Sequence, residues 1–542
     1  MKKINRTIIF LTVLLSLALV GCKTKAPVAQ EGMQVVKTTV QETVGTEVTM
    51  DTTSTADEVN ILYFNDFHGN VAEDVSDWGK NIGMAKMVSY ANDAKSTLSN
   101  TFVVSGGDNY QGTAVSNLTY GAPVSTMFKS LNVPFSSVGN HEFDWGVKHI
   151  TTWQEDGGFT FLAANIVDEE TGKPVSWAKP YGFVNIGQYK IAFVGLAHPN
   201  TSTLTSAANV EGLEFTDPAL ACQEWVNYLR EGHAEEGTPD AIIALTHIDS
   251  AQNRDTGEIT GNVCDLTTVD GLDAILSAHS HQTVSGTVNG MPIIQAYKYG
   301  RSIGRLTIKF NADKSIASIT PMVDPVYKIK SNIIPDEKSA ESLAIVEAET
   351  VEITGEVLGT AAAQFTHDRS TNNVTKLGYW FCKLQAEEFG TQVAINNGGG
   401  FRRSLEKGTV TMGDAYEIMP FDNYVITFDL PGSDLKAAID HGIENPEITD
   451  GAFYGVIVEY DPTAEFEHRI TSITINDGTP VEDDTLYSVS CNNFMFTGGD
   501  SYNFKNATNV VETYIPLRDI MVDAFKTQGV IAPLDVNCIT AK

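Results

Sequence analysis

The sequence predicts an α/β protein with two folded domains, and three observations support this. A chain of 542 residues exceeds what one hydrophobic core usually serves. Between residues 58 and 310, short apolar runs rich in β-branched residues alternate with segments of helical periodicity, which is typical of an α/β fold. An acidic segment of helical character, residues 336–357, separates this region from a second set of turn-rich motifs.

The N-terminus has the pattern of a bacterial export signal. Basic residues precede an apolar run, Ile8–Val20, which is too short to span a bilayer, and small Gly21 stands before Cys22. The end of this segment, LALVGC, resembles the lipobox of bacterial lipoproteins, in which the cysteine is lipidated after cleavage; an ordinary cleaved signal is the alternative. Residues 1–22 are therefore predicted to be a lipoprotein signal peptide, and the protein is expected to be extracytoplasmic and lipid-anchored to a bacterial membrane.

Residues 23–57 are rich in Thr, Val and Glu with little periodicity, which predicts a flexible tether. No later apolar segment reaches transmembrane length, so membrane contact is expected through the lipid anchor only. Besides Cys22, the chain has five cysteines, an odd number without a CxxC pair. Neither a zinc knuckle nor a full disulfide framework is indicated.

The charge balance restricts the class of ligand. Asp and Glu number 68 against 36 Lys and Arg, for a net charge of −32, and no extended Lys/Arg run could neutralise a polyphosphate backbone. Nucleic acid polymers are therefore not expected as partners. A small anionic substrate would be repelled at long range, so its site requires local cations or metal ions.

Five apolar runs in the first region each stop at a cluster of Asp, Asn or His. These are VNILYF before NDFHG, TFVVS before GGD, PFSSV before GNHEFDWG, AIIAL before THID, and LDAIL before SAHSH. Helical segments such as NIGMAKMVSYANDAKSTL and DPALACQEWVNYLREG lie between them. Because ligands of α/β sheets gather at the carboxyl ends of strands, the five clusters are expected to converge on one rim.

The candidate metal ligands in these clusters are Asp66, His68, Asp108, Asn140, His247, His279 and His281. In extended chain, residues two apart point the same way, so the Asp66/His68 pair and the His279/His281 pair could each bind one ion. Asp108 follows two glycines and could bridge two cations. Imidazole with carboxylate suits Zn, Mn, Fe or Co, and two such ions about 3.5 to 4 Å apart can activate a water on a phosphate ester.

His141 and Asp144 form a second candidate pair within GNHEFDWG. If the chain turns helical after Asn140, residues three apart share a face, so Asp144 could orient His141 beside the metals. His141 could then protonate the leaving oxygen or stabilise the transferring phosphoryl group. A single Asp or His at a strand end is more often a cap or turn residue, but five clusters in one order favour a site.

The order DxH, GGD, GNHxxxD, H, HxH resembles the metallophosphoesterase signature, and NDFHG, GDNYQG and GNHEFDWG resemble the 5′-nucleotidase family closely. The similarity covers most of residues 58–310. It implies a four-layer α/β/β/α metallophosphoesterase sandwich at residues 58–330 and a helical linker at 331–357. A separate α/β nucleotide-binding domain would follow at 358–542.

The resemblance also implies two divalent metal ions, Zn, Mn or similar. One would be held by Asp66, His68, Asp108 and His281, and the other by Asp108, Asn140, His247 and His279. His141 and Asp144 match the family's catalytic pair. One departure is Ala278, where many relatives have Gly before the HxH.

The second region contains NNGGGFRRS, MPFDNY and NNFMFTGGDSYNF, which resemble the family's C-terminal domain. The matching substrate-binding positions are Asn397 and Arg402 for sugar and phosphate, Phe421 and Phe494 for stacking on the base, Asn423 and Asp500 for base and ribose, and Arg369 as an additional arginine. Core packing is the alternative for each Phe, but the glycine-rich neighbours favour binding. Asp422 stands where relatives often have Gly and adds negative charge near the expected nucleotide.

The expected function is metal-dependent hydrolysis of extracellular nucleotides, a 5′-nucleotidase reaction that releases phosphate and nucleoside by attack of a bimetal-activated water. Within the same fold, a 2′,3′-cyclic nucleotide 2′-phosphodiesterase/3′-nucleotidase and a UDP-sugar hydrolase remain alternatives. A non-catalytic surface lipoprotein that binds a partner is a further alternative. Its sequence sign would be missing ligands, and none is missing here.

Overall fold

The computed structural model describes residues 45–75, 79–368 and 374–542. The signal segment with Cys22, most of the predicted tether, and Arg369 lie outside these ranges. Within them, no helix combines the length and the apolar character needed to cross a membrane.

The described part of the N-terminal region contains two large β-sheets and two small two-stranded ones. The six-stranded sheet has the order β17 (Ile316–Asp324), β16 (Ile303–Phe310), β2 (Glu58–Phe64), β3 (Thr101–Ser105), β4 (Phe135–Ser137) and β5 (Thr160–Leu162). The seven-stranded sheet has the order β1 (Thr46–Met50), β7 (Tyr181–Ile186), β8 (Tyr189–Leu196), β10 (Ala241–Asp249), β13 (Ala274–Ala278), β15 (Met291–Ala296) and β14 (Thr283–Val288). Strands β2–β5 are parallel, as are β8, β10, β13 and β15, and β1 is parallel to β7. The antiparallel pairs are β16 with β2, β17 with β16, β14 with β15, and β7 with β8. The sheets are therefore mixed, with parallel centres.

Residues 46–50 correct the predicted extent of the tether. They form β1, which pairs in parallel with β7, so they belong to the folded body. The segment TEVTM alternates in burial, Val48 packs on the core between the sheets, and Met50 is buried. This period-2 pattern over five residues is a strand signal that the surrounding Thr- and Glu-rich sequence obscures.

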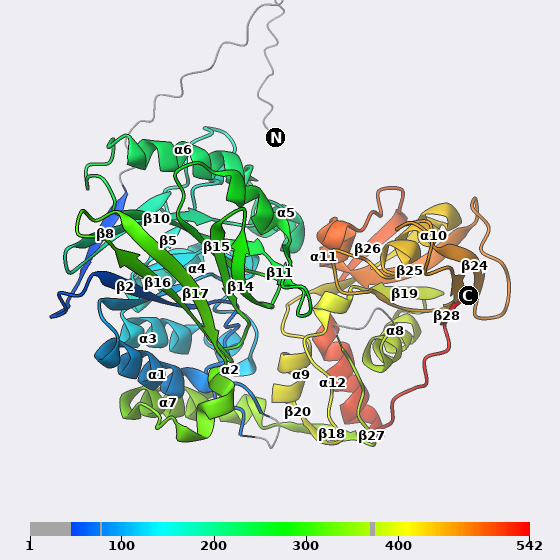
Figure 1. Cartoon of the computed structure of the whole chain (residues 1–542). Helices are drawn as coiled ribbons and strands as arrows, with labels where there is room; N and C mark the ends of the chain where they lie inside the picture. Colours follow the sequence, from blue (N-terminus) through cyan, green and yellow to red (C-terminus); the bar gives the residue numbers. More distant parts are fainter. Residues whose placement is uncertain (1–44, 76–78, 369–373) are drawn as a thin grey trace, which may run out of the picture. The chain divides into compact units, whose positions relative to one another are not determined.

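The two sheets face each other across a shared apolar core. Ile61 and Val104 from one sheet pack in the same cluster as Phe193 and Leu245 from the other. Helices α1 (Gly83–Thr97), α3 (Ala122–Leu131) and α4 (Lys148–Gly157) pack on the outer face of the six-stranded sheet. Helix α6 (Pro218–Arg230) packs on the outer face of the seven-stranded sheet (Figure 1). The layer order is α/β/β/α, which confirms the predicted fold class.

Capping explains where two of the predicted helices begin. The Asp217 carboxylate accepts backbone N–H groups of Ala219 and Leu220 at the start of α6. The Asp336 carboxylate accepts the N–H of Ser339 at 2.8 Å, which fixes the start of α7 (Glu337–Thr354) inside the predicted linker.

The C-terminal region also contains both helices and sheets. Its five-stranded sheet has the order β22 (Ala452–Tyr454), β19 (Val393–Asn396), β25 (Leu486–Asn492), β21 (Tyr424–Pro431) and β26 (Thr508–Pro516). Two three-stranded sheets are formed by β20 (Gly408–Thr411), β18 (Val357–Ala361) and β27 (Val530–Ile531), and by β24 (Ile470–Ile475), β23 (Val456–Tyr460) and β28 (Ile539–Ala541). The helices are α8 (Lys376–Phe389), α9 (Met412–Ile418), α10 (Gly432–His441), α11 (Asn493–Phe496) and α12 (Leu517–Gln528).

Two apolar cores hold this second region together. One joins α8 to α12 through Trp380 and Phe525, whose ring centroids lie 5.8 Å apart. The other joins α10 to the five-stranded sheet through Leu435 and Val489. The glycine-rich motifs follow the ends of β19 and β25, and they contribute Phe401 to the first core and Met495 to the second.

Candidate active site

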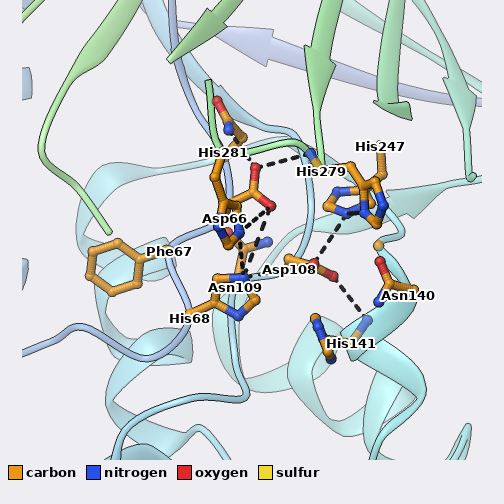
Figure 2. Close-up of polar contacts among 12 residues, drawn as sticks. Asp66, Phe67, His68, Asp108, Asn109, Asn140, His141, His247, His279 and His281 are labelled. Atoms are coloured by element: carbon orange, nitrogen blue, oxygen red, sulfur yellow. Dashed lines mark hydrogen bonds and ion pairs between the residues drawn. The ribbon is translucent and has the colours of Figure 1, made fainter. Parts of the chain in front are cut away.

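Six of the predicted ligands converge where the strands of the two N-terminal sheets end. They fall into two groups, within each of which the ligand atoms lie within 4.8 Å of one another: Asp66, His68 and His281, and Asp108, His247 and His279. Figure 2 shows the two groups side by side, with Asn140 and His141 adjoining Asp108. The two histidines of the HxH motif therefore belong to different groups. This grouping separates the two histidines that the spacing rule expects to bind one ion, and it coincides with the ligand sets that the family resemblance implies.

The backbone at these positions is left-handed rather than extended. The φ angles are 50° at Asp66, 49° at His68, 53° at Asp108, 68° at His279 and 57° at His281. Non-glycine residues rarely adopt this region, and each costs on the order of 1–3 kcal/mol. The expectation that extended chain aligns the two DxH side chains is therefore incorrect, since the chain leaves β2 at Phe64 and turns sharply after it.

Backbone hydrogen bonds between neighbouring loops support this conformation. The N–H of Asp66 donates to Gly107 O and the N–H of His68 donates to Asp108 O, both at 3.0 Å. The loop after β2 is thereby fixed against the loop after β3. Such an over-determined backbone is what allows strained positions to persist in a folded protein.

Hydrogen bonds to backbone carbonyls define the orientation of two imidazoles. Nδ1 of His68 lies 3.0 Å from Gln111 O, and Nδ1 of His247 lies 2.7 Å from Gly106 O. Because a carbonyl only accepts, each Nδ1 carries a proton, and in the neutral imidazole each Nε2 would present a lone pair to a metal ion. Those lone pairs point into the site, where Nε2 of His68 lies 3.1 Å from Nε2 of His281. Opposed imidazole nitrogens of this kind fit a cation between them.

The oxygen donors also fit metal ions. Oδ1 of Asn140 is buried and has no hydrogen-bond partner within the described ranges, and Oδ1 of Asp66, likewise without a hydrogen bond, lies 3.3 Å from Nε2 of His281. Asp108 lies between the groups, with Oδ2 3.1 Å from His247 Nε2 and 3.8 Å from His68 Nε2. An unsatisfied buried oxygen is costly unless a ligand pairs with it. This set of imidazole, carboxylate and amide donors suits a pair of transition-metal ions.

Burial and mutual charge perturb the titration of this cluster. Burial raises the pKa of Asp66 to about 7; positively charged His247 opposes this shift and the Asp108 carboxylate adds to it. Burial lowers the pKa of His247, but the Asp108 carboxylate outweighs this effect and raises it to about 10. The buried carboxylates therefore need nearby positive charge to stay ionised, and divalent cations would supply it.

His141 and Asp144 adopt the geometry expected from their spacing. The 3-10 helix η1 (Asn140–Phe143) places Nδ1 of His141 2.8 Å from Oδ2 of Asp144. Thr205 Oγ1 donates to the other Asp144 oxygen at 3.1 Å. Burial lowers the pKa of His141, but the carboxylates of Asp144 and Asp108 outweigh it, so the pKa is raised overall. Asp144 thus orients the imidazole and favours its protonated form.

Glu142 is a functional candidate that the sequence motifs alone do not identify. Its side chain is fully buried, and its carboxylate accepts the backbone N–H groups of Asp108 at 2.7 Å, Asn109 at 2.8 Å and Gly139 at 2.7 Å. It therefore joins the loop carrying Asp108 to the loop carrying Asn140. The motif GNHE does contain this glutamate. The sequence alone, however, does not distinguish a carboxylate that binds backbone N–H groups from one that binds a metal ion.

A pocket in the C-terminal region brings together part of the predicted nucleotide site. It is lined by Asn396, Asn397, Gly400, Phe401, Met419, Phe421, Asn423, Asn492 and Leu517. The Arg402 guanidinium lies 5.6 Å from the centroid of the Phe421 ring. Phe494 and Asp500 do not line this pocket. They lie in the adjacent segments α11 and η6 (Gly499–Ser501).

A chain of hydrogen bonds links these loops. Nδ2 of Asn492 donates to Asn397 Oδ1 at 2.9 Å, and Nδ2 of Asn397 donates to Asp500 Oδ2 at 2.7 Å. Asn492, another residue that the sequence motifs alone do not identify, thereby orients Asn397. Gly499 lies so close to the Phe494 ring that an added Cβ would fall 2.5 Å from it, so any larger residue there would displace the ring.

The two departures from the family pattern are accommodated locally. Asp422 Oδ1 accepts from Arg518 Nη2 at 2.9 Å, which compensates its negative charge. The guanidinium of Arg518 is itself 3.8 Å above the Tyr416 ring. Ala278 is buried at the end of β13, in register with Asp249 of β10.

Comparison with known proteins agrees with this architecture. The family described as calcineurin-like phosphoesterase matches residues 59–283, and the 5′-nucleotidase C-terminal domain matches residues 353–506. Endonuclease YhcR of Bacillus subtilis is 30% identical over 463 residues, which cover 81% of this chain but only 37% of that protein. The 5′-nucleotidase of Vibrio cholerae is 24% identical over 522 residues, covering 89% of this chain and 92% of its own.

Among solved structures, the 5′-nucleotidase precursor of Thermus thermophilus superposes with a TM-score of 0.78 at 22% identity, covering 89% of this chain and 99% of that one. At this identity the likeness establishes the fold and leaves the substrate open. The fold, the two matched domains and the relatives agree: this chain belongs to the 5′-nucleotidase family, in which a calcineurin-like phosphoesterase domain precedes a 5′-nucleotidase C-terminal domain.

Proposed function

We propose that this protein is a 5′-nucleotidase that hydrolyses extracellular nucleotides to nucleoside and phosphate with two divalent metal ions. The observation that carries this proposal is the pair of ligand groups with Asp108 between them and His141 adjoining. The family membership and relatives named 5′-nucleotidase support the substrate class.

The metal ligands are proposed as in the family. Asp66, His68, Asp108 and His281 would hold one ion, and Asp108, Asn140, His247 and His279 would hold the other. When bound, two such ions supply an activated water and positive charge for the phosphate oxygens. The protein's own part is to fix these donors, through the carbonyl partners of the imidazoles and the brace at Glu142.

His141 and Asp144 are proposed to supply the proton that the leaving oxygen takes up. With Nδ1 donating to Asp144, the opposite ring nitrogen of the protonated imidazole can donate to the leaving oxygen. The raised pKa of His141 favours the protonated form that makes this donation. Its positive charge also stabilises negative charge that develops on the leaving group.

The C-terminal pocket is proposed to bind the nucleoside. Phe421 and Phe494 would stack on the base, Asn423 and Asp500 would bind base and ribose, and Asn397, Arg402 and Arg369 would bind sugar and phosphate. The described contacts support part of this set, since Asn397 is hydrogen-bonded to Asp500 and Phe421 lies beneath Arg402. The proposal also places domain boundaries at residues 330 and 357. A lipid on Cys22 would anchor the protein to the membrane on its extracytoplasmic side.

The test measures phosphate release by the purified protein from 5′-AMP, 3′-AMP, 2′,3′-cyclic AMP and a UDP-sugar. Each is assayed with chelator and again after Mn or Zn is restored. Metal-dependent release from 5′-AMP, lost in His141→Ala, is the expected result. A preference for the 3′ or cyclic substrates, or for the UDP-sugar, would support one of the alternative hydrolases. Metal binding without hydrolysis of any of them would contradict the proposal and favour a binding lipoprotein.

A further inference from the structure

His441, at the end of helix α10, occupies an unusual environment in the C-terminal region. The residue is buried, and both ring nitrogens contact oxygen atoms at 2.8 Å. Nδ1 contacts Glu467 Oε1, and Nε2 contacts the backbone carbonyl oxygen of Asp500. The Tyr502 ring packs edge-on against the imidazole, with 4.8 Å between the centroids. None of these contacts is needed by the proposed chemistry at the metals.

The chemistry of the two contacts defines what the ring must donate. A carbonyl and a carboxylate are both acceptors, so a ring nitrogen that hydrogen-bonds to either one does so as an N–H donor. The contact with Asp500 O therefore requires the N–H on Nε2, and the contact with Glu467 lies on the opposite side of the ring. His441 thus links an acidic side chain to one particular backbone carbonyl.

That carbonyl belongs to a strained turn. Asp500 has φ 51° and ψ 27°, Ser501 has φ 62°, and the preceding Gly498 has φ 100°. Successive left-handed residues other than glycine are costly and persist only where surrounding contacts fix them. The hydrogen bond from His441 to Asp500 O is one such contact, made directly to the strained peptide.

The same turn presents two proposed substrate contacts. The Asp500 carboxylate accepts from Asn397 Nδ2 at 2.7 Å, at the edge of the nucleoside pocket. Gly499 lies against the ring of Phe494, so the position of the turn also limits where that ring can lie. A shift of this backbone would therefore move a ribose contact and a base contact together.

We propose that His441 is a positioning residue for nucleoside binding. By donating to Asp500 O, it holds the Gly498–Ser501 turn in the conformation that aims the Asp500 carboxylate at the ribose and supports Phe494. This inference rests on the proposed nucleotidase function and adds a residue to its substrate-binding machinery. It predicts an effect on substrate affinity and none on the chemical step.

The experiment compares His441→Leu, which removes both donors, with His441→Gln, whose amide can still donate to the Asp500 carbonyl. Initial rates of phosphate release from 5′-AMP give KM and kcat for the metal-loaded full-length protein. In His441→Leu, KM should rise about tenfold with kcat within about twofold, on the scale of one lost hydrogen bond. His441→Gln should recover part of the affinity.

The matched control is His233→Gln. His233 also contacts a glutamate, Glu231 Oε2 at 2.9 Å, but the pair is exposed in the N-terminal region, so KM should not change. Thermal melting of each variant verifies folding, and if the Leu variant does not fold, the Gln variant and Glu467→Gln decide the question by the same KM measurement. An active wild type with unchanged KM in the folded His441 variants, or a loss confined to kcat, would overturn this inference alone. A wild type that hydrolyses no 5′-AMP would instead overturn the proposed function.

Discussion

Replacing Glu142 with Gln tests whether one buried carboxylate holds the metal-binding loops together. The side chain keeps its size, but one acceptor oxygen becomes an NH₂ donor. Oε2 accepts from Asp108 N and Gly139 N, and Oε1 accepts from Asn109 N. In the better of its two orientations, the Gln amide retains the first two bonds and turns its NH₂ group toward the N–H of Asn109.

The expected cost combines two opposing terms. A hydrogen bond to a charged group is worth about 1.5–3 kcal/mol, and the buried N–H left unpaired costs about 1–3 kcal/mol more. Against this, burial and the Asp108 carboxylate raise the pKa of Glu142 to about 7, so the neutral amide relieves repulsion in the metal-free protein. The metal-free variant should therefore lose only about 1–3 kcal/mol of its free energy of unfolding. In the metal-bound protein the cations would remove the repulsion between Glu142 and Asp108, so the substitution would then cost the whole loss of hydrogen bonding.

The corresponding assay measures metal affinity by chelator competition, together with phosphate release and melting of the metal-free protein. The affinity should fall about 10- to 100-fold, as it does when outer partners of metal ligands are removed. Glu155→Gln, at an exposed position on α4, is the control and should match the wild type. Wild-type affinity in folded Glu142→Gln would refute the idea that this carboxylate braces the two loops.

Three further outcomes follow from the site. Asp144→Asn removes a charge that raises the pKa of His141, so kcat should fall about tenfold or more. The alkaline limb of the pH profile of kcat should move to lower pH, because the imidazole then loses its proton at lower pH. An unmoved alkaline limb would contradict the pairing of His141 with Asp144. Asp108→Ala should lose both ions, seen by elemental analysis, and lower activity at least about 100-fold; retention of one ion at full occupancy would argue against a bridging role. Asp422→Gly should change KM for 5′-AMP by less than about threefold, since Arg518 already compensates the carboxylate; a large fall in KM would show that its charge does reach the nucleotide.

The sequence predicts the fold well wherever periodicity and capping act locally. The apolar runs before the ligand clusters correspond to β2, β3, β4, β10 and β13, and Asp217 and Asp336 mark two helix starts. What periodicity could not show is that these five strands divide between two sheets, because sheet membership depends on contacts between distant segments. The strand β1 was hidden for a related reason, since its pairing with β7 decides its state.

At the site, residue type could be predicted but orientation could not. The position of His141 relative to Asp144 follows from helical spacing, which is local. The separation of His279 from His281 follows from left-handed φ angles at both residues, which nothing in SAHSH signals. Tertiary hydrogen bonds impose these angles, and spacing rules that assume a regular strand fail where the backbone is strained.

The strain itself points to how this acidic protein can handle an anionic substrate. The chain carries a net charge of −32, yet its candidate site buries carboxylates, among them Asp66 and Glu142, whose pKa values burial raises to about 7. Hydrophobic residues at these positions would avoid that cost, so folding alone does not explain the arrangement. Cations do explain it, because the field that repels a phosphate from the protein surface is the same field that attracts divalent ions into the site. On this reasoning, the left-handed backbone and the buried acids are a cost to the metal-free protein that metal binding would offset, and the ions would add to the positive charge that the proposed phosphate contact Arg402 offers an anionic substrate.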